Sequence, residues 1–166
     1  MGRNSHNPTY KGRNEGLISV TAVGAVFILI GIIFVTNVGL TQNTVSFFKD
    51  IKLVTYPLDN GDSVLVLPAP SNPASHIAFY NAVMQFALGI GILQVIILAL
   101  RLSFKSATGK IAETVGNLFF WFGVVVLINY LLQAGTYDSW FQFWGAFIIV
   151  TGFSLIARAI ICFVKR

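Results

Sequence analysis

Residues 114–166 read TVGNLFFWFGVVVLINYLLQAGTYDSWFQFWGAFIIVTGFSLIARAIICFVKR, and this stretch decides the fold. It contains two apolar runs, residues 115–132 and 141–164, separated by one short polar turn. A helix rises about 1.5 Å per residue, so a run of about 18 residues spans the roughly 30 Å hydrocarbon core of a bilayer. Because the turn is short, the two helices must be antiparallel neighbours. The stretch therefore predicts a transmembrane helical hairpin.

The composition of the whole chain favours the same environment. Of its 166 residues, 55% are apolar and only 10% are charged, whereas soluble domains contain about 25% charged residues. The long apolar segments are residues 17–38, 77–100, 115–132 and 141–164. We therefore predict an all-α membrane protein, a four-transmembrane-helix bundle in which residues 17–166 form a single membrane domain. Residues 1–16 are polar and are expected to form a cytoplasmic N-terminal tail.

The formal net charge of +5 is interpreted as a signal of topology. Nine of the 11 lysines and arginines flank one side of the predicted spans, and only Lys49 and Lys52 fall on the other side. Loops rich in Lys and Arg stay in the cytoplasm, so we expect a multi-pass protein of the cell membrane with both termini cytoplasmic. Nucleic-acid binding is not expected, because the basic residues are spread over three short segments without interleaved aromatic residues.

Residues 39–76, between the first two spans, form the one sizeable external loop. Early in this loop, Val45, Phe47 and Phe48 suggest a short amphipathic element at the membrane interface. An external loop of this length has room for structure of its own.

A short extracytoplasmic β-hairpin is predicted in the same loop. Residues 51–56 and 63–67 are rich in strand-forming side chains, and an Asn-Gly pair between them favours a tight turn. A lone hairpin is marginally stable in water, so it must lean on the membrane surface, the helix ends or a partner. We expect it to serve as a docking element, with contacts from Tyr56, Asn60, Gly61, Val64 and Val66.

Pairs of glycines seven residues apart recur in three of the predicted spans. On a helix this spacing places both glycines on one stripe, and small residues allow helix backbones to approach closely in lipid. We interpret the stripes as helix-packing surfaces; the alternative is a substrate passage or a hinge. The glycines concerned are Gly24, Gly31, Gly116, Gly123, Gly145 and Gly152.

Polar side chains within the spans gather at two depths. Near the cytoplasmic side, Gln94, Asn117 and Arg158 lie at similar levels, and we predict that they contact a lipid or a partner. The alternative for the arginine is a side chain that extends to the headgroups without a specific ligand. A looser layer near the outer side comprises Asn37, Asn81, Gln85, Asn129, Gln133 and Gln142.

No catalytic or cofactor-binding motif stands out in the sequence. Ionisable groups inside a membrane usually mark function, yet the middle of every predicted span lacks Asp, Glu, His and Lys. The external acids Asp59, Asp62 and Asp138, with His76, raise a metal hypothesis, but their spacing does not match a calcium loop. We therefore predict no catalytic residues, no metal site and no cofactor held by this chain alone.

These observations favour a non-catalytic integral membrane subunit that packs with and stabilises a larger membrane protein complex. Its expected partners are membrane lipids and either other integral membrane subunits or further copies of itself. Two alternatives stay open: a small oligomeric transporter or channel, with the polar layers facing a pore, and a membrane enzyme acting on lipid or quinone. Fold alone does not decide among them.

Overall fold

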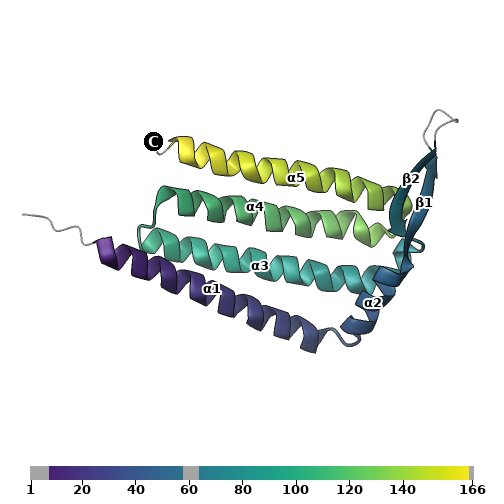
Figure 1. The fold of residues 1–166 in the computed structure, drawn as a ribbon, viewed down its shortest axis with the longest axis horizontal. Coiled ribbons are helices and arrows are strands. Elements are labelled where there is room, and N and C mark those ends of the chain that lie inside the picture. Colours follow the sequence, from purple (N-terminus) through teal and green to yellow (C-terminus); the bar gives the residue numbers. More distant parts are fainter. Residues whose placement is uncertain (1–7, 58–63, 165–166) are drawn as a thin grey trace, which may run out of the picture.

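The computed structural model of the chain describes residues 8–57 and 64–164 (Figure 1). The longest elements are helices: α1 (Pro8–Thr36), α3 (Ile77–Ser103), α4 (Thr108–Tyr130) and α5 (Tyr137–Val164). Between α1 and α3 lie the helix α2 (Leu40–Asp50), the strands β1 (Ile51–Pro57) and β2 (Val64–Pro70), and the 3-10 helix η1 (Pro73–His76). A second 3-10 helix, η2 (Leu132–Ala134), connects α4 to α5.

The four long helices confirm the predicted apolar segments. Within the described residues, four segments are long and apolar enough to cross a membrane: Gly16–Thr36, Pro73–Ser103, Thr108–Ala134 and Tyr137–Val164. Many of their large apolar side chains face outward, Phe27 at 70% and Ile148 at 71% exposure among them. In water such a surface would cause aggregation, whereas in a bilayer it contacts lipid. The four apolar helices indicate a multi-pass membrane protein.

The helices lie side by side in the order α1, α3, α4, α5, as an open row (Figure 1). Helix α4 packs closely against both α3 and α5, while α1 packs mainly against α3. The sequence predicted a four-helix bundle, with glycine stripes on three of the spans as its packing surfaces, whereas the helices form an open row. The difference arises because several of these stripes do not face a helix of the same chain.

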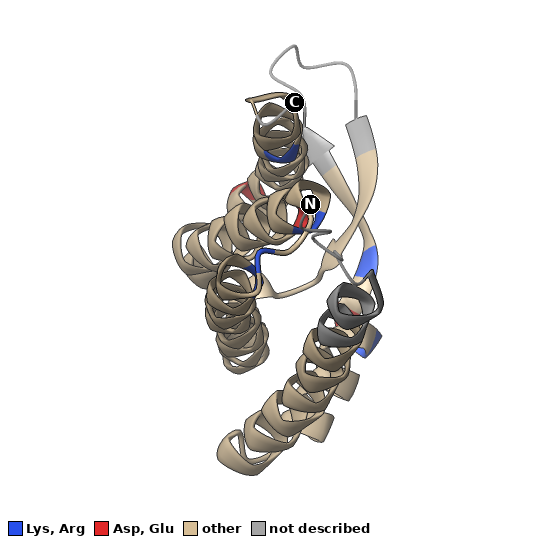
Figure 2. Cartoon of the chain, turned by 90° about the vertical axis from the view of Figure 1, so that its left-hand side faces the viewer, with Lys and Arg blue, Asp and Glu red and all other residues tan. Residues whose placement is uncertain are grey.

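The two ends of the row differ in character. The described N- and C-terminal helix ends and the α3–α4 turn lie together at one end, which we call the basic end (Figure 1). Figure 2 views the chain from this end and shows Lys and Arg positions, coloured blue on the ribbon, on α5 and on the α3–α4 turn. The opposite end, which we call the hairpin end, carries α2, the two strands and η1.

These last elements, residues 40–76, form a cap across the helix ends. Strands β1 and β2 pair antiparallel, with Leu53 opposite Pro68 and Thr55 opposite Val66. The predicted hairpin is thus confirmed, and its strands lie across the ends of α4 and α5 (Figure 1). The expected turn residues Asn60 and Gly61 lie outside the described residues.

The buried core of the chain lies at the hairpin end. It joins Phe47 and Ala69 of the cap to side chains of the three packed helices. The helix members are Tyr80, Ala87, Val124, Ile128, Trp140 and Phe143, with Leu132 from η2. The cap is therefore packed against the helices rather than suspended above them.

The structure gives definite bounds to two elements that the sequence only outlined. Helix α1 begins at Pro8, so helical structure extends into the residues expected as a polar tail, while its apolar part begins at Gly16. Proline is favoured at the first helical position, and the polar residues that follow it can extend a helix whose apolar part is already formed. Residues Leu40–Asp50 form an 11-residue helix, which gives the expected amphipathic element definite bounds.

Candidate functional site

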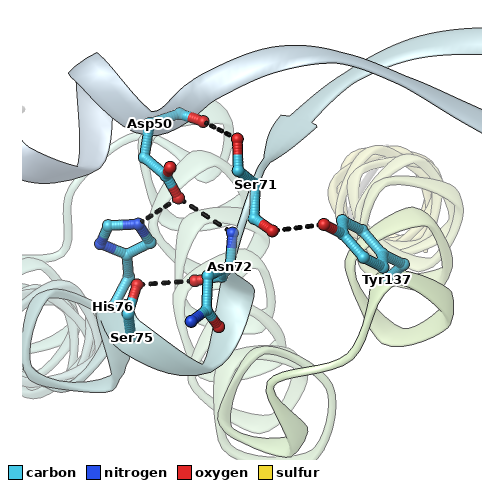
Figure 3. A network of polar contacts seen from close by, with 6 residues as sticks. All are labelled: Asp50, Ser71, Asn72, Ser75, His76 and Tyr137. Atoms are coloured by element: carbon cyan, nitrogen blue, oxygen red, sulfur yellow. Dashed lines mark hydrogen bonds and ion pairs between the residues drawn. The ribbon is translucent and has the colours of Figure 1, made fainter.

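One carboxylate fastens the cap, and it belongs to Asp50 at the end of α2. Its Oδ2 atom lies 2.9 Å from Nε2 of His76 and accepts the backbone N–H of Asn72 at 3.0 Å (Figure 3). An ionised carboxylate only accepts hydrogen bonds, so His76 Nε2 carries the proton. The side chain of His76 is 5% exposed and that of Asp50 is 25% exposed, so the contact is partly shielded from water. The end of α2 is thereby tied to the start of α3.

The backbone of Asp50 makes a second set of contacts with the chain that follows β2. Its carbonyl oxygen accepts the N–H of Ser71 at 3.0 Å and the hydroxyl of Ser71 at 3.1 Å. Ser75 Oγ donates to the carbonyl of Asn72 at 2.7 Å within the adjoining turn. The strand end and η1 are thus fixed together at one residue of α2 (Figure 3).

Helix α5 holds the hairpin from the other side. The hydroxyl of Tyr137 donates to the carbonyl of Ser71, and Trp140 Nε1 donates to the carbonyl of Pro68 at 3.2 Å. Both donors come from the first turn of α5. Pro68 and Ser71 lie in and just after β2, so the hairpin is clamped between α2 and α5.

The pKa of Asp50 lies below its ordinary value, chiefly because His76 donates a hydrogen bond to the carboxylate. The N–H of Asn72 lowers it further, while partial burial acts in the opposite direction. Hydrogen bonds to the charged form favour ionisation. The contact is therefore made by an ionised carboxylate at neutral pH.

An aromatic cluster packs beneath this polar network. Phe47 of α2 is 7% exposed and stacks on Phe79 with ring centroids 4.5 Å apart. The ring of Phe47 also meets the edges of His76 at 5.3 Å and Tyr80 at 6.0 Å. Such pairs contribute roughly 0.5–1.5 kcal/mol each beyond their buried area. The amphipathic helix is therefore anchored through its apolar face.

The hairpin leaves one apolar face uncovered. Cross-strand partners point to the same side of a sheet, and so do residues two apart along a strand. Leu53 and Val66 consequently share a face with Pro68, and they are 73% and 51% exposed. On the opposite face Ala69 is completely buried against the core. At Leu53 and Val66 the clamped hairpin thus presents an apolar surface that no described residue of the chain covers.

Of the residues predicted to form the hairpin surface, Tyr56, Val64 and Val66 lie in the paired strands. Val66 is exposed, as a docking role requires. Asn60 and Gly61 lie outside the described residues, so their part in docking stays a prediction.

The three residues predicted to contact a lipid or partner at the basic end are only partly brought together. Arg158 lies against α4, because a Cβ built at Gly116 would be 3.3 Å from its Cβ. Asn117 is the next residue on α4, and both it and Arg158 are exposed, while Gln94 is half-buried on α3. Among residues 8–57 and 64–164, no hydrogen bond joins these three side chains. Their proposed role stays a prediction.

Arg101 has a structural role that the sequence analysis missed. Its Nη1 donates to the carbonyl of Lys110 and to the hydroxyl of Thr114, which is completely buried. The arginine thus closes the turn between α3 and α4. From the sequence, Arg101 is only a basic residue at the end of an apolar run. That position is expected for any arginine that sets membrane topology, so it did not indicate a hydrogen-bonding role.

The outer polar layer is partly paired. Asn37 donates to Gln85 at 2.9 Å, and Gln133 donates to Asn81 at 2.8 Å. These contacts join the residue that follows α1 to α3, and η2 to α3. The sequence analysis had grouped these four residues because they lie at similar depth along the spans, but it did not predict which of them pair.

The six predicted packing glycines divide into two groups. A Cβ at Gly123 would lie 2.5 Å from Val150 Cγ1, and one at Gly116 would lie 3.0 Å from the carbonyl oxygen of Ser154. These two glycines therefore allow α4 to approach α5 closely. At the other four positions a Cβ would meet nothing within 4 Å, so they make no close helix contact within the described chain: Gly24, Gly31, Gly145 and Gly152.

A glycine that the sequence analysis did not single out positions the cap. Gly135 has φ of 64°, a conformation that favours glycine, and its Cβ would lie 2.9 Å from Cα of Ala74 in η1. The η2–α5 turn can therefore lie directly against the cap. The sequence predicted the turn between the two apolar runs but not its contact with η1.

No family of known proteins, no curated protein and no solved structure matches this chain. Within the described ranges, no group of three His, Cys, Asp or Glu side chains is placed to hold a metal ion.

Proposed function

We propose that the chain is a non-catalytic integral membrane subunit that stabilises a larger membrane protein complex through its cap. The observation that carries this proposal is the exposed apolar surface of the hairpin, formed by Leu53 and Val66. This face belongs to a hairpin held in one position by hydrogen bonds that Asp50 accepts and that Tyr137 and Trp140 of α5 donate. A partner of matching shape would bury it without having to order it first.

The energetics favour docking over permanent exposure. Removing apolar surface from water contributes about 25 cal/mol per Å². Part of the cost of association is the ordering of loops and side chains at the interface. Because the cap is already packed on the helices through Phe47 and Trp140, much of that ordering is complete before a partner arrives.

The distribution of charge supports a role without catalysis. In the described spans, charged side chains occur only near the helix ends, such as Arg101 on α3 and Lys110 on α4. Proton relays and ion pathways use ionisable groups within the membrane. A subunit that packs and stabilises has no need of them.

We place the basic end in the cytoplasm and the cap outside, in the cell membrane. The described part of the basic end carries Arg101, Lys105, Lys110 and Arg158. Positively charged loops stay in the cytoplasm during insertion. The partner that meets the cap is accordingly an integral membrane protein with an extracytoplasmic surface.

The test is photo-crosslinking in native membranes. A photoreactive amino acid replaces Leu53, and in a matched control it replaces the neighbouring exposed residue Lys52, which points to the opposite side of the strand. We expect a discrete adduct from position 53, little from position 52, and loss of the adduct when Val66→Glu is added. Absence of any adduct from position 53, with the chain purifying alone after mild solubilisation, would contradict the proposal.

A further inference from the structure

An apolar groove of about 500 Å³ lies beneath the cap. It exists because α3 and α5 each pack against α4 and leave a space between them. Its lining residues include Val83 of α3, Val124 of α4 and Phe147 of α5. None of the described lining residues is charged, so the groove by itself selects only for apolar character.

The helix stripes that line this groove become polar toward the basic end. Residues seven or 11 positions apart lie on nearly the same side of a helix, because about two or three whole turns separate them. The groove residues and their polar counterparts are Val83 with Gln94 on α3, Val124 with Asn117 on α4, and Phe147 with Ser154 and Arg158 on α5. The three helices run between the hairpin end and the basic end (Figure 1). The groove therefore continues into these four polar residues, which we call the polar strip.

The polar strip is not satisfied within the described chain. Among residues 8–57 and 64–164, none of its four side chains makes a hydrogen bond or an ion pair. Glu113 lies one turn from Gly116 toward the basic end, but it pairs with Lys110 at 3.4 Å. Arg158 lies six residues before the end of α5, about 9 Å along the helix. A cation at this depth is unfavourable without a partner, so the strip calls for an anion from outside the chain.

The members of the polar strip can be reached from outside the protein. Arg158 and Asn117 are exposed, and Gln94 and Ser154 are half-buried. None of their polar atoms is among the described side-chain atoms that are both enclosed and unpartnered. Gly116 keeps the space beside them open, because its Cβ would lie 3.7 Å from Oγ of Ser154 and 3.3 Å from Cβ of Arg158. The two polar residues of α5 therefore lie together against the backbone of α4.

We propose that the polar strip and the groove together bind one anionic phospholipid from the leaflet at the basic end. The phosphate accepts hydrogen bonds from the flat, forked guanidinium of Arg158, a geometry that suits phosphate. The hydroxyl of Ser154 and the amide of Asn117 donate to the remaining phosphate and ester oxygens. A zwitterionic headgroup is disfavoured, because the described acid near the strip, Glu113, is already paired with Lys110. Basic pockets between transmembrane helices bind anionic headgroups in this way.

The acyl chain of the same lipid accounts for the groove. The 11 positions from Arg158 to Phe147 correspond to a rise of about 16 Å, which is close to half of the roughly 30 Å hydrocarbon core. A chain that starts at the polar strip and runs along α4 therefore reaches the groove within its own leaflet. Val83 lies at the matching distance from Gln94 and is 37% exposed, so the chain meets it there. The site needs no docked partner, so its test is independent of the proposed subunit role.

Native mass spectrometry of the full chain can test this binding. Protein in dodecyl maltoside is titrated separately with dioleoylphosphatidylglycerol and dioleoylphosphatidylcholine, which share their acyl chains and differ in net charge. We expect one phosphatidylglycerol to be retained to saturation, with apparent binding about tenfold tighter than that of phosphatidylcholine, as for one hydrogen bond between charged groups. Dihexanoylphosphatidylglycerol has the same headgroup, but its short chains cannot fill the groove, and it should bind at least about tenfold more weakly.

Four variants separate the headgroup from the acyl chain. Arg158→Gln removes the guanidinium and should weaken phosphatidylglycerol binding about tenfold. Lys105→Gln removes the same charge from the exposed α3–α4 turn and should weaken it less than about twofold. Val83→Phe fills the groove and should weaken binding of the dioleoyl lipid while leaving that of the dihexanoyl lipid unchanged. Val126→Phe makes the same change in a different groove, between α4 and α5, and should leave both unchanged.

Thermal unfolding in the same detergent checks that the variants fold. Without added lipid, Arg158→Gln should melt at the wild-type temperature, because its side chain has no partner in the described chain. Phosphatidylglycerol should raise the melting temperature of the wild type more than that of Arg158→Gln. Equal retention of the two dioleoyl lipids, or equal losses from Arg158→Gln and Lys105→Gln, would overturn the proposal. So would equal binding of the short-chain lipid, since the headgroup would then be held without the groove.

Discussion

At the scale of single residues, Asp50 determines how the cap is held. Its carboxylate and carbonyl oxygens together accept hydrogen bonds from Ser71, Asn72 and His76. These three residues follow the hairpin, so a single acceptor residue closes the loop that contains both strands. Loss of its carboxylate would leave the N–H of Asn72 and Nε2 of His76 without this acceptor, while the backbone carbonyl would still accept from Ser71.

The ionisation of Asp50 predicts a specific loss of stability in acid. Its pKa is lowered in the folded chain, so the carboxylate contributes stability that is fully present above the unfolded pKa of about 4 and is lost as the pH falls through the lower folded value. We expect wild-type thermal stability to decrease below about pH 4 by more than that of Asp50→Asn. The measurement is thermal unfolding in detergent, followed by tryptophan fluorescence, over a series of pH values.

A matched control for this acid effect is Glu113→Gln at the basic end. Glu113 pairs with Lys110 at 3.4 Å, but both side chains are well exposed, and surface pairs contribute little. We therefore expect this variant to follow the wild-type pH dependence. If Asp50→Asn also followed it, the carboxylate would not be the group that stabilises the cap.

At the scale of elements, the glycine stripes of α4 and α5 should differ sharply in their tolerance of substitution. Gly123→Leu drives a side chain into Val150 and should destabilise the α4–α5 pair by about 1–3 kcal/mol, as for an overpacked core. Gly152→Leu meets open space within the chain and should cost less than about 0.5 kcal/mol. Unfolding of the purified chain in mixed detergent micelles would measure both, and equal losses would contradict the packing we describe.

The same comparison shows what the sequence could predict about elements. Runs of about 20 apolar residues predicted four spans, since length and hydropathy suffice to identify a transmembrane helix. Spacing alone placed two glycines on one stripe but could not indicate which neighbour the stripe faces. Gly152 therefore looked equivalent to Gly123, although only the latter lies against another helix of the chain.

The candidate site was less predictable, because its contacts join distant residues. The strands and the apolar residues around Phe47 were visible as local patterns. Asp50 and His76 are separated by 26 positions, and no motif links them. Tyr80 occurs in an apolar run where a tyrosine is unremarkable, and only packing shows that its hydroxyl is buried without a hydrogen-bond partner among the described residues.

At the scale of the whole molecule, the open row leaves α1 attached through few contacts. Helix α1 packs mainly on α3, where a Cβ at Gly89 would lie 2.4 Å from Cδ1 of Leu29. The Asn37–Gln85 hydrogen bond joins the same two helices near the hairpin end. Apolar helices gain little hydrophobic stabilisation from each other in lipid, so close packing and hydrogen bonds must hold α1 in place.

Gly89→Leu should therefore move α1 without disturbing the remaining helices. The new side chain would occupy the space of Leu29, while α3, α4 and α5 keep their own contacts. Distances between spin labels can measure this movement after Cys162→Ser removes the native thiol.

A label pair at the exposed positions Val20 and Ile96 should report a longer and broader α1–α3 distance. A second pair at Phe119 and Leu155 should report an unchanged α4–α5 distance. An unchanged α1–α3 distance would mean that α1 is held by more than the Leu29–Gly89 packing and one hydrogen bond. A change in both distances would mean that the four helices behave as one closed unit.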